Sequence, residues 1–259
     1  MSDLMKGKRG LIMGVANEKS IAWGIAREMA AQGAELAFTY QGEAFGKRVQ
    51  PLAASVGSNI LVDADVTDDN SLDTAFSELK EKWGKLDFIV HAVAYSDKNE
   101  LNGRYVDTSK DNFINSLSIS CYSFTRIAKI FQPILNPGGS LVTLSFHGAS
   151  KVMPNYNVMG VAKAALETSV KYLSVDLGDQ DVRVNAISAG PMRTLAGAAI
   201  ANARDVFNYT SENSSLKRNV NLDELGNSAL YLVSDLSSAI TGEIHYVDCG
   251  FNIIGMPKS

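Results

Sequence analysis

The sequence predicts an α/β fold in which a doubly wound parallel sheet carries helices on both faces. Short apolar runs alternate with amphipathic helical segments along the whole chain. No linker, repeat or low-complexity segment interrupts this alternation, so we expect residues 1–259 to form a single domain of Rossmann type. Its 259 residues, 46% of them hydrophobic, suffice to bury the core of such a domain.

Seven segments are expected to be strands of this sheet. They are residues 10–14, 35–40, 59–64, 86–92, 140–144, 181–187 and 243–248. The main helices are expected at residues 20–32, 69–83, 109–135, 155 onward and 223–236. Ligands of such sheets bind at the carboxyl ends of the strands, so functional residues should gather in the loops that follow them.

Composition narrows the classes of partner. A net charge of -4 gives no electrostatic reason to expect nucleic acid or an anionic membrane. The N-terminus lacks an apolar signal region and no apolar run approaches 18 residues, so we expect a cytoplasmic protein. Two cysteines, Cys121 and Cys249, suit a reduced compartment. The three histidines, His91, His147 and His245, are isolated, so no metal site is expected.

The first strand, its loop and the following helix predict a phosphate site. Gly14 ends the strand, and after the loop at 15–19 Ser20 is placed either to cap the helix or to bond a phosphate oxygen. The unpaired amides and the dipole of a helix N-terminus favour an anion. Because only Gly14 and Gly24 remain of the usual G-x-G-x-x-G pattern, the prediction rests on the order of strand, loop and helix.

The ends of the second and third strands are expected to hold an adenosine. Gln41 follows the second strand, where an acid would select NAD and an arginine would accept NADP; this neutral side chain does not decide between them. Lys47 and Arg48 could bind a 2′-phosphate, although a solvated helix face is the simpler interpretation. Asp65 could accept a hydrogen bond from adenine, and it could also help to start the next helix. Small residues at 92–94, after the fourth strand, would let a flat ring approach the backbone.

Tyr156 and Lys163 are the central pair of candidate catalytic residues. They are seven positions apart in a segment that is polar at its start and then rich in Ala and Leu. At about 100° per residue, seven positions make almost two turns, so the phenol and the ammonium lie on one face of a helix. We expect the ammonium to lower the pKa of the phenol toward working pH. The alternative is a half-buried aromatic residue beside a solvated lysine.

Residues 192–218 form the least regular part of the chain. They combine Gly197, a run of alanines and a tail rich in Ser and Asn, directly after the sixth strand. We expect a mobile segment that covers a substrate, with an ordinary pair of peripheral helices as the alternative. Residues 250–256 are apolar enough to be buried between subunits, which predicts an oligomer.

Together these motifs resemble the short-chain dehydrogenase/reductase superfamily and, within it, the bacterial NADH-dependent enoyl-[acyl-carrier-protein] reductases. The resemblance covers nearly the whole chain. It is carried by Gly14-x5-Ser20-x-Ala22, Tyr40-Gln41, Pro154-Asn-Tyr156-Asn-Val-Met-Gly-x-Ala-Lys163 and Arg183-Val-Asn-Ala-Ile-Ser-Ala-Gly-Pro191 through Arg193-Thr-Leu-Ala196. Ordinary members of the superfamily space this tyrosine and lysine by four positions, whereas a spacing of seven is typical of the reductases.

The resemblance implies reduction of the trans-2 double bond of enoyl-acyl-carrier-protein thioesters by hydride transfer from NADH, in fatty-acid elongation. It implies catalytic positions at Tyr156, Lys163 and Phe146, with Tyr156 donating a hydrogen bond to the thioester oxygen. The implied NADH contacts are Gly14, Ser20, Ile21, Gln41, Asp65, Val66, Val93, Lys163, Met192, Arg193, Thr194, Leu195 and Ala196. The implied substrate contacts are Tyr95, Ser96, Phe146, Tyr156, Met159 and Ile200. An acyl carrier protein and a homotetramer are the implied partners.

Phe146 and Ala94 depart from the usual family pattern. Phe146 stands where many relatives have a second tyrosine; it can pack but cannot donate a proton, so Tyr156 must act alone. Ala94 stands where glycine is usual, and His147 is not expected to take over the missing hydroxyl.

A carbonyl or 3-ketoacyl reductase remains the alternative function, because Ser145 lies eleven positions before Tyr156. A cofactor-binding regulator without catalysis is a second alternative.

Overall fold

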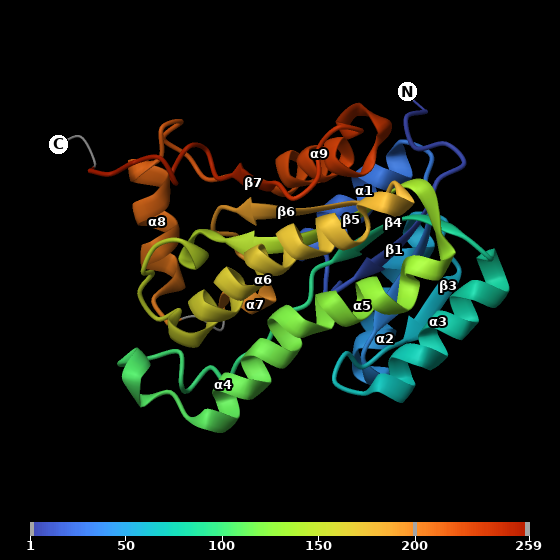
Figure 1. Ribbon diagram of the computed structural model, residues 1–259. Coiled ribbons are helices and arrows are strands. Elements are labelled where there is room, and N and C mark those ends of the chain that lie inside the picture. Colours follow the sequence, from blue (N-terminus) through green and yellow to red (C-terminus); the bar gives the residue numbers. More distant parts are fainter. Residues whose placement is uncertain (1–2, 199–200, 257–259) are drawn as a thin grey trace.

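The computed structural model describes residues 3–198 and 201–256, and its centre is one sheet of seven parallel strands (Figure 1). The strands follow the order β3-β2-β1-β4-β5-β6-β7. The direction of winding reverses between β1 and β4, so the connections from these two strands leave toward opposite faces and a crevice opens between them. The predicted doubly wound parallel sheet is confirmed.

All seven expected strands are present, most of them with shifted ends. They are β1 (Arg9–Met13), β2 (Glu35–Tyr40), β3 (Ile60–Asp63), β4 (Leu86–His91), β5 (Leu135–Phe146), β6 (Arg183–Ala189) and β7 (Ile244–Val247). The helices are α1 (Ile21–Ala31), α2 (Gly42–Ser55), α3 (Asp69–Trp83), α4 (Lys110–Leu117), α5 (Ser123–Phe131), α6 (Asn157–Asp176), α7 (Leu195–Ala198), α8 (Ala203–Asn213) and α9 (Leu222–Val233). Among the described helices, none combines the length and apolar character that crossing a membrane requires.

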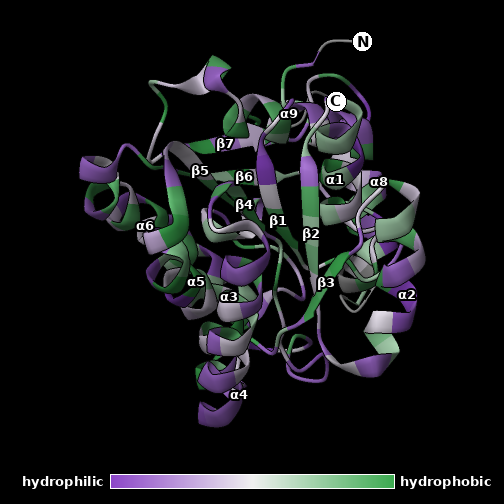
Figure 2. Ribbon diagram, turned by 90° about the vertical axis from the view of Figure 1, so that its right-hand side faces the viewer, coloured by the Kyte–Doolittle hydropathy of each residue, from purple (hydrophilic) through white to green (hydrophobic). Residues whose placement is uncertain are grey.

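Two apolar layers hold the helices against the sheet. Successive residues of β1 alternate between them: Leu11 belongs to the layer under α3, α5 and α6, and Ile12 to the layer under α1, α2 and α9. Both faces of the strands are therefore buried, as expected for a parallel sheet. Figure 2 shows the consequence, with hydrophobic strands inside and helices whose hydrophilic residues face outward.

The long helix expected at residues 109–135 is interrupted. A π-helical turn (Ser118–Tyr122) joins α4 to α5, and a 3₁₀ turn (Gln132–Ile134) follows. Within the π turn, the Ser120 hydroxyl accepts a hydrogen bond from the Tyr95 amide at 3.0 Å. Such turns are common at functional sites, and this one ties the loop after β4 to the helix. β5 also starts earlier than expected, because Leu135 pairs with Leu86 ahead of an irregularity in the register.

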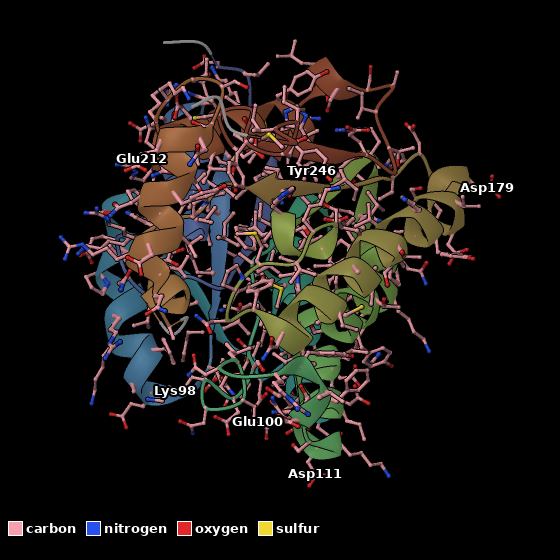
Figure 3. All side chains as sticks on the ribbon, turned by 90° about the vertical axis from the view of Figure 1, so that its left-hand side faces the viewer. Lys98, Glu100, Asp111, Asp179, Glu212 and Tyr246 are labelled. Carbon is pink, nitrogen blue, oxygen red and sulfur yellow. The ribbon has the colours of Figure 1, made fainter. Side chains whose placement is uncertain are left out.

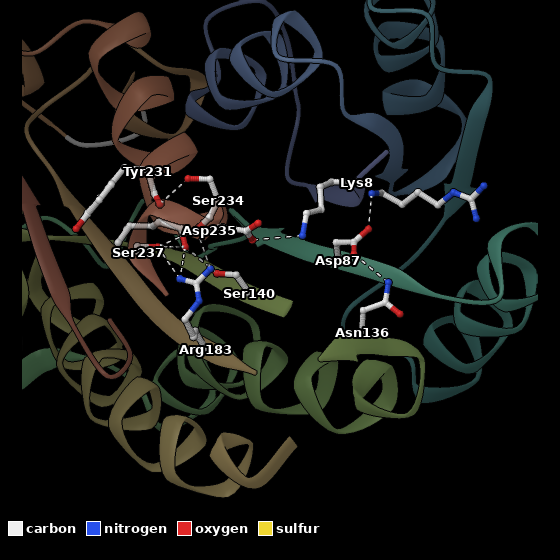
Figure 4. A network of polar contacts seen from close by, with 11 residues as sticks. Lys8, Asp87, Asn136, Ser140, Arg183, Tyr231, Ser234, Asp235 and Ser237 are labelled. Atoms are coloured by element: carbon white, nitrogen blue, oxygen red, sulfur yellow. Dashed lines mark hydrogen bonds and ion pairs between the residues drawn. The ribbon is translucent and has the colours of Figure 1, made fainter. Parts of the chain in front are cut away.

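A polar network lies at the amino-terminal end of β6, where Arg183 is paired with Ser140 of β5 (Figure 4). The buried guanidinium of Arg183 donates to the backbone oxygens of Leu232 (2.7 Å) and Ser234 (3.2 Å) and to the Ser237 hydroxyl (2.6 Å). Ser140 also donates to the Leu232 oxygen, at 3.0 Å. The last turn of α9 is thereby fixed to the sheet on the side opposite the strand ends that carry the predicted site.

We expect Arg183→Met to lower the free energy of unfolding by about 2 kcal/mol or more, because it removes three hydrogen bonds donated by a buried charged group. In a chain of this size, that loss should lower the melting temperature by roughly 4 °C or more, which thermal denaturation followed by circular dichroism would measure. Arg104→Met is the control, since Arg104 is 75% exposed and pairs with its near neighbour Asp107. Equal melting temperatures for the two variants would contradict a stabilising role for Arg183.

Candidate active site

A cleft of about 1170 Å³ lies at the carboxyl ends of the central strands. It brings together residues that are far apart in the sequence, as the crevice at the reversal of strand order predicts. Of the predicted site residues, those that line it are Gly14, Ser20, Ile21, Val93, Tyr95, Ser96, Phe146, Tyr156, Met159, Lys163, Met192, Arg193, Thr194 and Leu195.

The remaining predicted residues lie elsewhere. Gln41 and Asp65 meet beside the ends of β2 and β3, where the Gln41 amide donates to Asp65 Oδ2 at 2.8 Å. Val66 packs partly buried against the core next to them. The backbone of Ala196 belongs to α7, but its side chain and all of Ile200 lie outside the described part of the chain.

The phosphate end of the cleft is shaped by Gly14 and Ser20. Gly14 has a φ of +94°, and a Cβ there would lie 2.1 Å from the Ala92 carbonyl oxygen, so only glycine keeps β1 and β4 in contact at this point. The Ser20 hydroxyl accepts from the amides of Ala16 (3.0 Å) and Asn17 (3.1 Å). It therefore fixes the loop instead of capping α1. The helix N-terminus faces the cleft, which fits the pyrophosphate of a dinucleotide.

Tyr156 is held between two asparagines in left-handed backbone conformations. Asn155 (φ 57°) donates through its side-chain amide to the Ala201 oxygen at 2.9 Å, just before α8. Asn157 (φ 34°) donates to the Gly103 oxygen at 3.3 Å, in the loop after β4. α6 consequently begins at Asn157, two residues later than expected. The tyrosine thus stands where both walls of the cleft are tied to one helix end.

The Tyr156 ring is enclosed by Phe146 and Gly148. Its centroid lies 5.0 Å from that of Phe146 at an interplanar angle of 65°, an edge-to-face contact. On its other edge, a Cβ on Gly148 would lie 2.4 Å from Tyr156 Cδ1. Gly148 is therefore required for the position of the phenol, and Phe146 supplies packing alone.

We expect Gly148→Ala to lower kcat at least tenfold, because the added methyl group pushes the ring away and small misplacements of catalytic groups are costly. Gly178→Ala is a matched control, since a Cβ at Gly178 meets no atom within 4 Å. Steady-state kinetics of both variants would test the expectation. A Gly148→Ala enzyme with the wild-type kcat would show that the phenol tolerates this displacement.

Lys163 is buried on the same side of α6, and its ammonium donates to the Leu144 backbone oxygen at 2.7 Å. Burial lowers the pKa of Lys163 to about 8. The expectation for its partner was wrong: burial, followed by the nearby Glu167 carboxylate, raises the pKa of Tyr156 well above its ordinary value. Desolvation of the phenolate outweighs the field of the lysine. Tyr156 is therefore a neutral phenol, suited to donating a hydrogen bond.

The pKa of Lys163 predicts a pH dependence. The ammonium is present below about pH 8 and is lost as the pH rises through that value, so kcat/KM for the dinucleotide should fall on the alkaline side. Lys163→Arg keeps its charge at high pH and should remove this limb from the profile, even where the absolute rate is lower. A wild-type profile that stays flat to about pH 9.5 would contradict the assignment.

The polar groups of Ser145 and His91 are engaged by neighbouring side chains. The Ser145 hydroxyl donates to Glu167 Oε1 at 2.6 Å. Both ring nitrogens of His91 are hydrogen-bonded, to Thr143 and Ser123. His147 packs edge-on against Phe251, with ring centroids 5.4 Å apart. No cluster of metal-binding side chains occurs in residues 3–198 and 201–256.

The apolar cleft residues that sequence reasoning missed include Leu101, Met153 and Phe207. Leu101 is only 4% exposed and packs in a small cluster with Tyr156 and Met159. As the one large apolar residue in the polar stretch 96–104, it could have been recognised. Phe207 carries the Arg193 guanidinium 4.5 Å from its ring centroid. This contact joins distant parts of residues 192–218, and sequence spacing does not indicate it.

The comparison with known families decides the assignment. The family model described as Enoyl-(Acyl carrier protein) reductase matches residues 14–252. The chain belongs to this family.

Relatives of this reductase family agree over the full length of the chain. "Enoyl-[acyl-carrier-protein] reductase [NADH] 2" of Rhizobium meliloti is 62% identical, over 99% of this chain and 96% of the relative. The crystal structure of FabI from Candidatus Liberibacter asiaticus has a TM-score of 0.98 at 55% identity, covering 100% of both chains. The reductase of Anaplasma phagocytophilum, solved in complex with NAD, has a TM-score of 0.97 at 58% identity and covers 100% and 99%. The predicted family, fold and enzyme class are confirmed.

Proposed function

We propose that this reductase transfers hydride from NADH to the β-carbon of a trans-2-enoyl thioester carried by an acyl carrier protein, as a step of fatty-acid elongation. The supporting observation is a buried phenol just before α6 and a buried ammonium on α6, both lining a cleft that also reaches the N-terminus of α1. The names of the relatives, which specify NADH, support the cofactor.

The residues of the cleft fit NADH, which supplies the hydride when it is bound. Gly14, Ile21 and the N-terminus of α1 hold the pyrophosphate, and Lys163 bonds the nicotinamide ribose. The adenosine reaches Gln41 and Asp65, with Val66 beside the adenine. Val93 would pack against the nicotinamide half of the cofactor. The segment Met192 to Ala196, which includes Arg193, Thr194 and Leu195, would contact the same half.

The substrate half of the site is apolar and contains one donor. Tyr95, Phe146 and Met159 line the place for the acyl chain, and Ile200 is proposed to complete it. Ser96 contacts the thioester through its backbone. As hydride reaches the β-carbon, negative charge develops on the thioester oxygen, and the Tyr156 hydroxyl donates to it. A preorganised donor of this kind contributes about 2.7–4 kcal/mol, and the charge of Lys163 stabilises the same anion.

The raised pKa of Tyr156 suits this role. A phenol that stays protonated at neutral pH can stabilise an oxyanion without losing its proton. A 3-ketoacyl reductase would need a further donor for its carbonyl, and Ser145 is the candidate from sequence. Because that hydroxyl donates to Glu167, the geometry favours the enoyl reaction.

We further propose a homotetramer in the cytoplasm, with residues 192–218 as the substrate cover. Large apolar side chains on the outer face of α6 support burial between copies, since Tyr172 is 72% and Val175 77% exposed in the single chain. Tyr122, in the π turn beside them, is 57% exposed. The apolar residues Ile253 and Met256 near the C-terminus are also largely exposed.

A panel of thioesters tests this function. With NADH, trans-2-enoyl thioesters should be reduced and 3-ketoacyl thioesters should not, as followed by the loss of NADH absorbance. Tyr156→Phe should lower kcat on enoyl substrates by roughly 100-fold or more, the effect of one lost oxyanion donor, with little change in NADH affinity. Full activity of Tyr156→Phe would contradict its role, and preferential reduction of ketoacyl thioesters would contradict the function.

A further inference from the structure

The carboxyl ends of β2 and β3 bear on the choice between NADH and NADPH. In doubly wound sheets the adenosine ribose lies here, and the residue after the strand distinguishes a 2′-hydroxyl from a 2′-phosphate. Gln41 occupies that position and is neutral. The neighbouring strand β3 places Asp63 opposite Tyr40, so its carboxylate reaches the same strand end.

Asp63 occupies the start of α2. Its Oδ1 accepts a hydrogen bond from the Gly42 backbone amide at 2.9 Å, at the first residue of the helix. Amides at a helix N-terminus bind phosphate oxygens well, since the unpaired N–H groups and the helix dipole both favour an anion. At this helix, a carboxylate from the adjacent strand has taken that place.

Neighbouring side chains do not neutralise the negative charge of Asp63. Asp65 is the second carboxylate at the end of β3, and it holds the Gln41 amide at 2.8 Å. Lys47 pairs with Glu43 at 2.6 Å, and the Arg48 guanidinium lies 5.7 Å from the centre of the Phe45 ring. Both cations that could hold a 2′-phosphate therefore have other contacts.

We propose that Asp63 makes this reductase discriminate against NADPH. Its carboxylate, oriented by the Gly42 amide, repels a 2′-phosphate, whereas the 2′-hydroxyl of NADH is uncharged and is not repelled. The inference rests on the proposed function, because it takes the end of β2 as the ribose site.

The test compares NADH and NADPH in wild type and Asp63→Asn. Asparagine keeps an oxygen for the Gly42 amide and removes the charge, so the start of α2 is preserved. The preference ratio, kcat/KM for NADPH over that for NADH, should rise about tenfold, as expected for one partly screened like-charge repulsion. Asp63→Ala also frees the amide for a phosphate oxygen and should raise the ratio further.

Asp179→Asn is the matched control. It removes the same charge from a turn before β6, at the opposite edge of the sheet from the end of β3 (Figure 3). Its preference ratio should equal that of wild type. An unchanged ratio in Asp63→Asn, or an equal rise in Asp179→Asn, would overturn the proposal.

Calorimetric dissociation constants for the two nucleotides separate this inference from the proposed reaction. If enoyl thioesters are not reduced but Asp63→Asn still tightens NADPH binding relative to NADH, only the reaction assignment fails. If thioesters are reduced and the ratio of dissociation constants does not move, only the role of Asp63 fails.

Discussion

The site depends on one cation held inside the protein. Lys163 is buried, and the short bond from its ammonium to the Leu144 oxygen anchors α6 to the end of β5. A buried ammonium is costly unless it is hydrogen-bonded, so the helix cannot shift along the strand without losing its main polar contact. This anchor fixes the helix whose start follows directly on Tyr156. The same burial that lowers the pKa of the lysine raises that of the tyrosine. The same burial therefore produces an ammonium that loses its proton more readily and a phenol that keeps its proton.

The position of the phenol is determined by contacts on every side, which explains why a helix start carries such strained backbone. Two left-handed asparagines flank the tyrosine, and each side-chain amide binds a different wall of the cleft. Asparagine tolerates this conformation better than most residues. The side-chain hydrogen bonds of the two asparagines, to the loop after β4 and to the chain just before α8, offset the cost of this backbone strain. Both walls of the cleft are thus tied to the residue that is proposed to donate to the substrate.

Much of this arrangement could be predicted from the sequence, because periodicity and spacing are local properties. The spacing of Tyr156 and Lys163 predicted that they belong to one site, and both line the cleft, although α6 begins only after Tyr156. The apolar runs predicted each strand of the sheet. The sign of the pKa shift could not be predicted in this way, since it depends on how completely Phe146, Gly148 and Met159 enclose the phenol. Likewise, the spacing that made Ser145 a candidate donor gave no sign of Glu167, which lies across the helix–strand contact. The π turn beside Tyr95 was also hidden, because its sequence is compatible with a continuous helix.

The two ends of the cleft depend on different parts of the fold. The chemistry at the nicotinamide end relies on α6, β5 and the loop after β4, whereas the adenosine end relies on the carboxyl ends of β2 and β3 and on the start of α2. At the proposed ribose site, Gln41 contacts Asp65, and Asp63 accepts from the Gly42 amide at the start of α2. A substitution among them changes the charge at the ribose without moving the anchor of Lys163. The strand ends that are proposed to set cofactor preference lie on the far side of the reversal point from α6, so this preference can vary while the proposed reaction stays the same.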